Sequence, residues 1–344
     1  MLKLRRGRVL SADPLVVVVD GQERKAWADP ALVGEVREGD EVVVNVESMD
    51  LGLGSGGFDV VHVNLTRGLE GPGAAGTHVM KLNYTSLQHP VLPVERAVGS
   101  LESDPAGSSG MPVLVIPLHG HLAPVTWAAA EAGPGLKVGF IQTAGGALSG
   151  TLSRDLAALR ERGLVRDHIT AGPCFGGDHE AISTAGALDA AATSLGWDAA
   201  IVGPGPGILG SATDLGHGGI TAVENAHAAL ALGLPTLLSP RLSSTDRRDR
   251  HRPLSHHTRT ALDLLLGPVE VVVPDGFPDA REAVEGAKGA HRLASAPADL
   301  DAYAKTGLPA RTMGRELTDD PVFFAAPLAA GRRLAQVAAG HEAS

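Results

Sequence analysis

Short runs of apolar residues alternate with turn-forming Gly, Pro and Asp residues throughout this chain. The segments between these runs are short in the first part of the chain and longer in the second. From Leu2 to about Leu65 the apolar runs follow one another with only turns between them. From Met111 onward, similar runs are separated by stretches with the length and spacing of helices. Consecutive short strands are typical of an all-β module, and alternating strands and helices indicate βαβ units. The pattern therefore predicts a small all-β domain followed by an α/β domain.

The first domain, residues 1–67, is predicted to be a small barrel-like domain of the SH3-like or OB type. Asp20-Gly21 lies between two apolar runs and indicates a two-residue hairpin turn. The expected strands are Arg8–Leu10, Leu15–Val19, Glu23–Ala28, Glu41–Val46 and Phe58–Leu65. This domain has few aromatic residues on which bases could stack, so we expect it to serve packing or oligomerisation rather than nucleic-acid binding.

A connector rich in Gly, Pro and Ser, residues 68–110, follows the barrel. Within it, His78–Gln88 is denser in polar side chains and contains a tyrosine. This piece fits a strand that crosses between the domains. It also fits a segment that places polar side chains in a ligand pocket shared by both domains. The two alternatives stay open, and Asn83 and Tyr84 are candidate ligand-binding residues.

The second domain, residues 111–344, is predicted to be a doubly wound, mainly parallel α/β sheet of the Rossmann-like class. Its expected strands are Val113–Pro117, Lys137–Gln142, His168–Ala171, Ala199–Gly203, Thr236–Ser239 and Val269–Val273. The helices expected between them are Val125–Ala132, Leu152–Arg162, Glu180–Leu195, Thr221–Leu232 and His257–Leu266. Prolines recur in the last part of the chain, which we expect to be irregular before a final helix over Leu328–Ala339.

Composition narrows the classes of function. The formal net charge is -10 and aromatic residues make up 3% of the chain, which argues against a general binder of nucleic acid or of anionic membranes. No run reaches the roughly 18 apolar residues needed to cross a bilayer. The single cysteine, Cys174, excludes an intramolecular disulfide and is typical of a reducing compartment, so we expect a cytoplasmic protein. Cys174 itself fits either a reactive thiol or a small buried residue.

Polar residues follow the carboxyl ends of the expected strands, one loop after another. Such ends lie at one edge of a parallel sheet, so these loops should converge on one crevice, where open α/β sheets bind their ligands. Histidines recur in the loops, although connecting loops need only turn formers such as Gly, Pro and Asn. The histidines concerned are His119, His121, His179, His217, His251, His256 and His257. This concentration of histidine is the main sequence evidence for a functional site.

Glycine-rich loops follow two of the expected strands. Glycine allows the backbone to approach a ligand closely, and the N-terminus of the following helix could bind an anion such as phosphate, although plain tight turns need the same residues. Neither loop matches a P-loop, and Gly205–Gly210 lacks the acidic partner of a dinucleotide-binding fingerprint. The candidate ligand-binding residues of these loops are Gly145, Gly146, Ser149, Gly205, Gly207, Gly210 and Thr213.

Five residues are the catalytic candidates: His119, His121, Asp178, His179 and His217. His119 and His121 flank one glycine and could act as an acid–base pair or as metal ligands. Asp178 and His179 are expected at the beginning of a helix, where Asp178 could serve only as an N-cap. His119, His121 and His179 are the candidates for metal binding. No recognised ligand spacing accompanies them, so neither a metal nor any other cofactor is assigned.

The loop from Arg241 to Arg250 carries four arginines and two aspartates. It fits a solvated loop of mixed charge, or a lid that offers arginines to an acidic substrate. Arg241, Ser243, His256 and His257 are candidate ligand-binding residues.

Several motifs, taken together, resemble one known family. They are Lys81–Gln88 (KLNYTSLQ), Leu118–Leu122 (LHGHL), Gly172–Glu180 (GPCFGGDHE), Gly203–Gly207 (GPGPG) and Leu254–Thr258 (LSHHT). In combination they are similar to DUF3866, a family of uncharacterised bacterial proteins, over nearly the whole chain. The family carries no assigned activity, cofactor or catalytic residue, so the resemblance implies a shared architecture and no mechanism.

The leading hypothesis from the residues is an enzyme that acts on a small phosphorylated or carboxylated molecule in the crevice at the strand ends. The histidines would supply acid–base or metal chemistry. A non-catalytic metabolite sensor of the same fold and a structural protein that assembles through its barrel are the alternatives. The expected partner is a small-molecule ligand, with no nucleic acid and no membrane, and a homo-oligomer is compatible with the sequence.

Overall fold

The computed structural model describes residues 1–53, 56–71, 73, 75–97 and 109–341. The chain divides into two compact units, Met1–Val91 and Leu92–Ser344. The division falls inside the segment expected to be a connector, and residues 98–108 of that segment lie outside the described part. None of the helices in the described ranges is long and apolar enough to cross a membrane.

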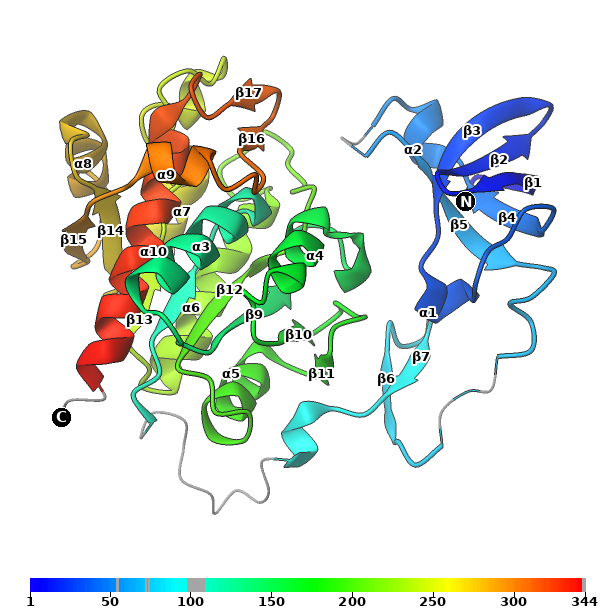
Figure 1. Cartoon of the computed structure of the whole chain (residues 1–344), viewed down its shortest axis with the longest axis horizontal. Helices are drawn as coiled ribbons and strands as arrows, with labels where there is room; N and C mark the ends of the chain where they lie inside the picture. The colour runs from blue at the N-terminus through cyan, green and yellow to red at the C-terminus, as the bar shows by residue number, and fades with distance from the viewer. Residues whose placement is uncertain (54–55, 72, 74, 98–108, 342–344) are drawn as a thin grey trace. The chain divides into compact units, whose positions relative to one another are not determined.

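The first unit contains a closed barrel (Figure 1). Its strands are β1 (Leu4–Ala12), β2 (Leu15–Val19), β3 (Gln22–Trp27), β4 (Glu41–Asn45) and β5 (Asp59–Asn64). The order around the barrel is β1-β2-β3-β5-β4, with β3 and β5 parallel and the other pairs antiparallel. This five-stranded order agrees with the OB type, one of the two predicted barrels. Alternating valines, including Val17, Val42 and Val44, fill the interior.

The predicted hairpin turn at Asp20-Gly21 joins β2 to β3. Both residues have positive φ, 49° and 79°, which is the conformation of the turn type that matches strand twist. Two short helices, α1 (Pro30–Val33) and α2 (Glu47–Asp50), belong to the same unit. A separate hairpin of β6 (Val79–Lys81) and β7 (His89–Val91) ends the unit.

The second unit contains an eight-stranded sheet in which every pair is parallel. Its strands are β8 (Val113–Val115), β9 (Val138–Thr143), β10 (His168–Ala171), β11 (His179–Ala181), β12 (Ala199–Pro204), β13 (Thr236–Leu238), β14 (Glu270–Pro274) and β15 (Arg292–Ala296). Their order is β11-β10-β9-β12-β8-β13-β14-β15. The predicted strands are all present, and the two edge strands β11 and β15 are additional. The Rossmann-like α/β class predicted from the sequence is confirmed.

Helices cover both faces of this sheet (Figure 1). They are α3 (Leu122–Ala132), α4 (Arg154–Glu161), α5 (Thr184–Thr193), α6 (Thr221–Ala231), α7 (His256–Leu264), α8 (Pro278–Glu285), α9 (Leu300–Ala304) and α10 (Pro321–His341). One core contains apolar residues of α3, α4 and α9 and most of those of α10, and the other contains those of α5, α6, α7 and α8. Right-handed crossovers account for this segregation, because connections that run in opposite directions along the sheet lie on opposite faces.

Two expectations about the elements are wrong. Residues His179–Ala181 form strand β11, paired with β10, and the next helix begins only at Thr184. The segment around Pro297–Pro327 is not irregular throughout, since it contains α9 and the β16 (Arg311–Thr312) and β17 (Arg315–Glu316) hairpin. The last helix already begins at Pro321 and continues through Pro327. Proline is well tolerated at the first turn of a helix, and burial of apolar side chains along α10 offsets the interior proline.

The topology creates a switch point at the carboxyl edge of the sheet. Strand β8 lies between β12 and β13. The helix that follows β8, α3, packs on one face, whereas α6 and α7, which follow β12 and β13, pack on the other. The connections after β8 and after its two neighbours therefore diverge to opposite faces of the sheet, and such a switch point is the usual place for a ligand in an open α/β sheet.

Candidate functional site

His119 and His121 stand on a single 3-10 turn, η3 (His119–His121), directly after β8. The ring of His119 contacts the end of β12, because its Nδ1 donates a hydrogen bond to the carbonyl oxygen of Pro204 at 3.1 Å. The ring of His121 contacts the end of β13, because its Nδ1 is hydrogen-bonded to Oγ of Ser239 at 3.0 Å. The turn thus directs the two side chains to the two neighbours of β8.

His119 is held at both ring nitrogens. Since a carbonyl only accepts, Nδ1 carries the proton and Nε2 accepts a hydrogen bond from Oγ of Ser153 at 2.6 Å. Ser153 is also the N-cap of α4. Burial lowers the pKa of His119, and burial raises the pKa of the nearby Asp155 carboxyl. His119 is therefore a neutral ring that ties three elements together.

His121 is fully buried, and burial together with the charge of Arg241 lowers its pKa to about 3. Its ring packs edge-on against Phe323 of α10, with ring centroids 5.3 Å apart. Within the described part of the chain, Nε2 of His121 has no hydrogen-bond partner. This imidazole is neutral at physiological pH and packs into the core of the unit.

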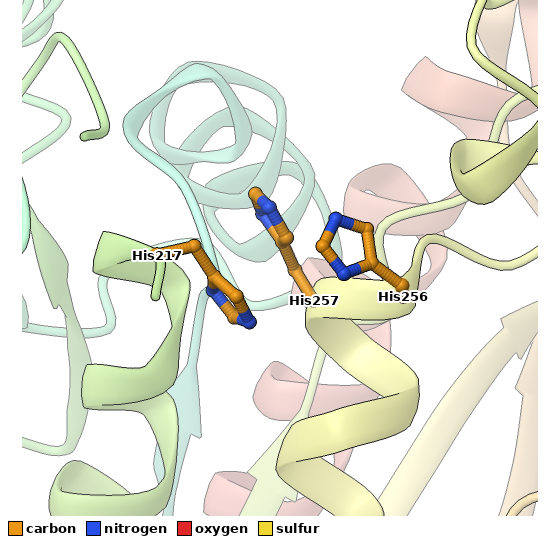
Figure 2. A group of neighbouring side chains, drawn as sticks. All are labelled: His217, His256 and His257. Carbon is orange, nitrogen blue, oxygen red and sulfur yellow. The ribbon is translucent and has the colours of Figure 1, made fainter. Parts of the chain in front are cut away.

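Four other histidines form a ring cluster, defined as His217, His251, His256 and His257. His217 follows the loop after β12, His251 ends the 3-10 turn η6 (Asp249–His251), and the other two begin α7. The rings of His217 and His257 stack with centroids 3.9 Å apart and an interplanar angle of 9°. The His256 and His257 centroids lie 4.4 Å apart, and His251 is 5.0 Å from each of them. Figure 2 shows the ring of His257 between those of His217 and His256.

The histidine cluster is electrically neutral at physiological pH. Burial, and after it the charge of Arg241, lowers the pKa of His251 to about 3. Burial, His217 and Arg241 lower the pKa of His257, and burial also lowers the pKa values of His217 and His256. Neutral imidazoles can accept protons or bind metal ions, whereas imidazolium rings can do neither.

Two buried nitrogens of the cluster have no hydrogen-bond partner among the described residues. His217 donates from Nε2 to the backbone oxygen of Asp214 at 2.9 Å, so its Nδ1 is the unprotonated nitrogen. Neither Nδ1 of His217 nor Nε2 of His256 has a hydrogen-bond partner among the described residues, and both atoms are buried. Nδ1 of His257 accepts a long hydrogen bond of 3.4 Å from Arg241.

Arg241 is buried against this cluster and its charge is poorly compensated. Its nearest carboxylate is that of Asp246 at 3.6 Å, and its Nε has no hydrogen-bond partner in the part of the chain that the structure describes. Asp246 is shared with Arg248 at 3.0 Å and with Arg315 at 3.5 Å. Burial and the neighbouring arginines lower the pKa of Arg241 to about 10. Such a guanidinium has unused capacity for an anion.

A hairpin turn covers Arg241. The thioether sulfur of Met313, between β16 and β17, lies 3.7 Å from Nη2 of Arg241. Ser243 anchors the same region, since its Oγ donates to the carboxylate of Asp320 at 2.5 Å. Asp320 also accepts from the backbone nitrogen of Ser244 at 2.9 Å. Ser243, a predicted ligand-binding residue, thus has its hydroxyl engaged within the protein.

The predicted glycines bring two loops into backbone contact. A Cβ on Gly146 would meet the carbonyl oxygen of Gly205, and a Cβ on Gly145 would meet that of Gly218. The contact is reinforced by a hydrogen bond from Ala147 to the Pro206 oxygen at 2.7 Å. Close packing of the loops after β9 and β12 is therefore what these glycines serve in the structure.

The remaining loop candidates lie nearby but turn to internal partners or solvent. Ser149 is buried and its Oγ is 2.9 Å from Oγ1 of Thr151. Thr213 is exposed and its hydroxyl accepts from the nitrogen of Gly216 at 3.0 Å. Gly207 has a positive φ of 75°, and Gly210 forms an isolated bridge with His217.

Asp178 and His179 lie elsewhere. His179 is paired with Ile169 near the amino end of β10, and the Asp178 carboxylate accepts from the backbone nitrogen of His168 at 2.9 Å. Asp178 also forms an ion pair with Arg160. The structure therefore places both residues at the opposite end of the strands from the crevice. Asp178 is a strand-edge anchor there and not the N-cap of a helix.

The structure also gives the positions of Cys174, of Asn83 and Tyr84, and of the candidate metal ligands. Cys174 is buried. Asn83 and Tyr84 are exposed in the loop of the β6–β7 hairpin, in the first unit, and Tyr84 is 94% exposed with a positive φ of 59°. The candidate metal ligands His119, His121 and His179 do not form a group within metal-binding reach in the described ranges, whereas His217, His256 and His257 do.

A groove of about 1100 Å³ includes Ser243. Its arginines are engaged: Arg252 pairs with Asp249, and Arg259 donates to the backbone oxygens of Gly286 and Ala283. No histidine lines it among the described residues. The groove is therefore less suited to an anion than the surroundings of Arg241.

Several residues of the site are absent from the sequence-based candidates. Asp214, Asp246, His251 and Arg315 contact the histidines or arginines described above. Asp246 and His251 belong to the polar loop that the sequence singles out, but nothing in their spacing distinguishes them from its solvated charges. Arg315 comes from a hairpin far along the chain, and no sequence signal connects it to the site.

Comparison with known proteins agrees with this architecture. No curated protein and no solved structure matches the chain. One family does match, over residues 25–331, and it is described as a protein of unknown function. The matched range begins within β3, includes β4 and β5 of the barrel and covers nearly all of the second unit, so the chain belongs to the DUF3866 family.

Proposed function

We propose that this protein is an enzyme that acts on a small anionic molecule, phosphorylated or carboxylated, at the carboxyl edge of the parallel sheet. The observation that carries the proposal is the buried guanidinium of Arg241, which contacts His257 of the histidine cluster. The cysteine content further supports work in a reducing cytoplasm, since Cys174 has no second cysteine to pair with.

Arg241 would bind the anionic group. A buried guanidinium without a close carboxylate is costly, and an anion in bidentate contact would relieve this cost. The nearest carboxylate, on Asp246, is shared among three arginines and stays 3.6 Å away from Arg241. An incoming phosphate or carboxylate would displace the sulfur of Met313 from the guanidinium.

The histidines would supply the chemistry beside the bound anion. Nδ1 of His217 and Nε2 of His256 are unprotonated or unpaired nitrogens in a buried setting. Such nitrogens can accept a proton from a substrate or hold a metal ion that polarises it. A metabolite sensor would use the same anion site without turnover, so consumption of the ligand separates the two functions.

The test uses the full chain and two arginines of one loop. Thermal unfolding is measured against a panel of phosphorylated and carboxylated metabolites, and each stabilising compound is then followed by mass spectrometry for conversion. Arg241→Gln should lose the stabilisation and the conversion, whereas Arg247→Gln should keep both because Arg247 is exposed. Stabilisation without conversion would identify a sensor. Unchanged binding in Arg241→Gln would exclude the proposed anion site.

A further inference from the structure

We propose that His217, His256 and His257 form a binding site for one divalent transition metal ion of the zinc class. One nitrogen from each ring can be chosen so that the three atoms all lie within 4.8 Å of one another. The catalytic use of the metal rests on the proposed function, but its binding can be measured without any substrate.

His217 has the hydrogen-bonding pattern of a metal ligand. Ligating histidines almost always donate their second N–H to a backbone carbonyl or a carboxylate, which fixes the tautomer and the ring orientation. Nε2 of His217 makes this bond to the backbone oxygen of Asp214 at 2.9 Å. The lone pair of Nδ1 is then directed into buried space without a partner in the described part of the chain.

The ring of His256 lies near the side chain of Asp214. Its Nδ1 faces Oδ1 of Asp214 at 3.9 Å, while its Nε2 is buried and lacks a hydrogen-bond partner among the residues described. Asp214 therefore holds the ring of His217 through its backbone oxygen, and its carboxylate lies near the ring of His256. A small inward movement of this exposed carboxylate would complete the second hydrogen bond.

His257 completes the site beside Gly219. A Cβ placed on Gly219 would lie 3.2 Å from Nδ1 of His217 and 3.3 Å from Nδ1 of His257. Glycine at this position thus leaves free the space that the two ring nitrogens share. The bond that Nδ1 of His257 accepts from Arg241 is 3.4 Å long, so a metal would replace a weak interaction.

Modest side-chain rotation would bring the nitrogens to bonding distance. Zinc–nitrogen bonds of about 2.0–2.1 Å in a tetrahedral site require nitrogens about 3.4 Å apart. The present upper limit of 4.8 Å must therefore shorten, and the stack of His217 on His257 must open.

The donor set selects the class of metal. Imidazole nitrogens suit zinc, copper, nickel and iron, whereas magnesium and calcium prefer oxygen ligands. Three protein ligands leave one tetrahedral position open, as in catalytic zinc sites. When bound there, the ion would polarise a water molecule or the substrate. Arg241, which contacts His257, would then bind the same anionic substrate as the metal ion.

Arginines and carboxylates near the site act on a bound cation in opposite directions. Arg241 and Arg250 act against a cation, while Asp214 favours positive charge at His217 and His256. Asp246 adds a second carboxylate near His251 and Arg241. Metal affinity should accordingly be moderate in the absence of an anion and higher when an anion shares the ion with Arg241.

The experiment measures metal binding to the full chain stripped with a chelator. Titration with Zn²⁺ alone by calorimetry should give one equivalent, and Co²⁺ should give the visible absorption of a tetrahedral site. His217→Ala and His256→Ala should each lower Zn²⁺ affinity at least about tenfold. His62→Ala, in the barrel, is the control and should bind like the unmodified chain.

Circular dichroism and thermal unfolding of the metal-free variants separate loss of ligands from loss of fold. His256 is only partly buried, so His256→Ala provides a variant that stays folded. Unchanged Zn²⁺ affinity in folded His256→Ala, or no stoichiometric Zn²⁺ binding by the unmodified chain, would overturn the proposal. Arg241→Gln distinguishes the two proposals, since it should lose anion binding and still show the Co²⁺ spectrum.

Discussion

The imidazole rings of His217 and His257 lie face to face, with centroids 3.9 Å apart and planes inclined by 9°. Two imidazolium cations would repel each other at this distance, so the stack requires that at least one ring is neutral. Burial provides this neutrality by lowering the pKa values of both rings, and Arg241 lowers them further. Neutral histidines are therefore a structural requirement of the site as well as a chemical resource.

The first prediction concerns the pH dependence of stability and uses His121, which lies outside the proposed metal ligands. Its pKa falls from 6.5 to about 3 on folding, so the unfolded chain binds the proton more tightly. The stability contributed by the neutral ring is fully present above pH 6.5 and is lost as the pH falls toward 3. The free energy of unfolding should decrease in this window by about 1.4 kcal/mol per pH unit for this one histidine.

His121→Asn tests this slope. The amide preserves a polar partner for Ser239 but does not titrate. Urea unfolding between pH 7 and pH 5, with chelator present, should give a shallower pH dependence for the variant than for the unmodified chain. Parallel curves would mean that folding does not lower the pKa of His121.

A second prediction separates the stability that Ser153 contributes as a helix cap from the stability that its hydrogen bond to His119 contributes. Ser153 caps α4 and also donates to Nε2 of His119, whereas Ser183 caps α5 through the nitrogen of Gly186 and is exposed. Ser183→Ala should cost about 1 kcal/mol, the usual value of a lost N-cap. Ser153→Ala should cost about 1–2 kcal/mol more, because it leaves a buried ring nitrogen without a partner. Equal losses in urea unfolding would show that the His119 bond adds nothing.

His119 and His217 also show what can and what cannot be predicted from the sequence. Both residues follow apolar strands and both were expected at the crevice, and their loops do lie at the carboxyl edge. Apolar runs predict the strands because buried parallel strands need continuous hydrophobic residues. Nδ1 of His119, however, meets the carbonyl of Pro204 through the packing of β8 beside β12, whereas Nε2 of His217 meets the carbonyl of Asp214 in its own loop. The sequence pattern does not show which of these carbonyls each ring meets.

The edge position of β11 explains why Asp178 and His179 were assigned to the beginning of a helix. Strand β11 consists of His179, Glu180 and Ala181, and two of these residues are only partly buried. A strand with so few apolar residues has no hydrophobic pattern. The sequence around Asp178 and His179 therefore predicts an N-cap followed by a helix. Arg315 shows a second limit, because its ion pair with Asp246 joins segments separated by a helix-rich stretch of chain.

A third prediction tests the space between the ring nitrogens. Gly219→Ala would put a methyl group 3.2 Å from Nδ1 of His217 and 3.3 Å from Nδ1 of His257. Zn²⁺ affinity, measured by calorimetry, should fall about tenfold because the rings could no longer converge. Gly120→Ala is the matched control in the same crevice, since its nearest atoms would lie 3.7 Å and 3.8 Å away. An undiminished affinity in Gly219→Ala would contradict the assigned geometry.

The last prediction uses the buried carboxylate that Arg241, Arg248 and Arg315 share. Asp246→Asn removes the negative charge from among three guanidinium groups, and removal of one partner from a buried ion pair costs about 3–5 kcal/mol. The melting temperature should fall, and inorganic phosphate should restore part of the loss because the anion takes the place of the carboxylate beside Arg241. Chloride at equal ionic strength is the control, since it screens charge without bidentate hydrogen bonds. Phosphate should stabilise Asp246→Asn more than the unmodified chain, and equal stabilisation of the two would show that the anion binds elsewhere.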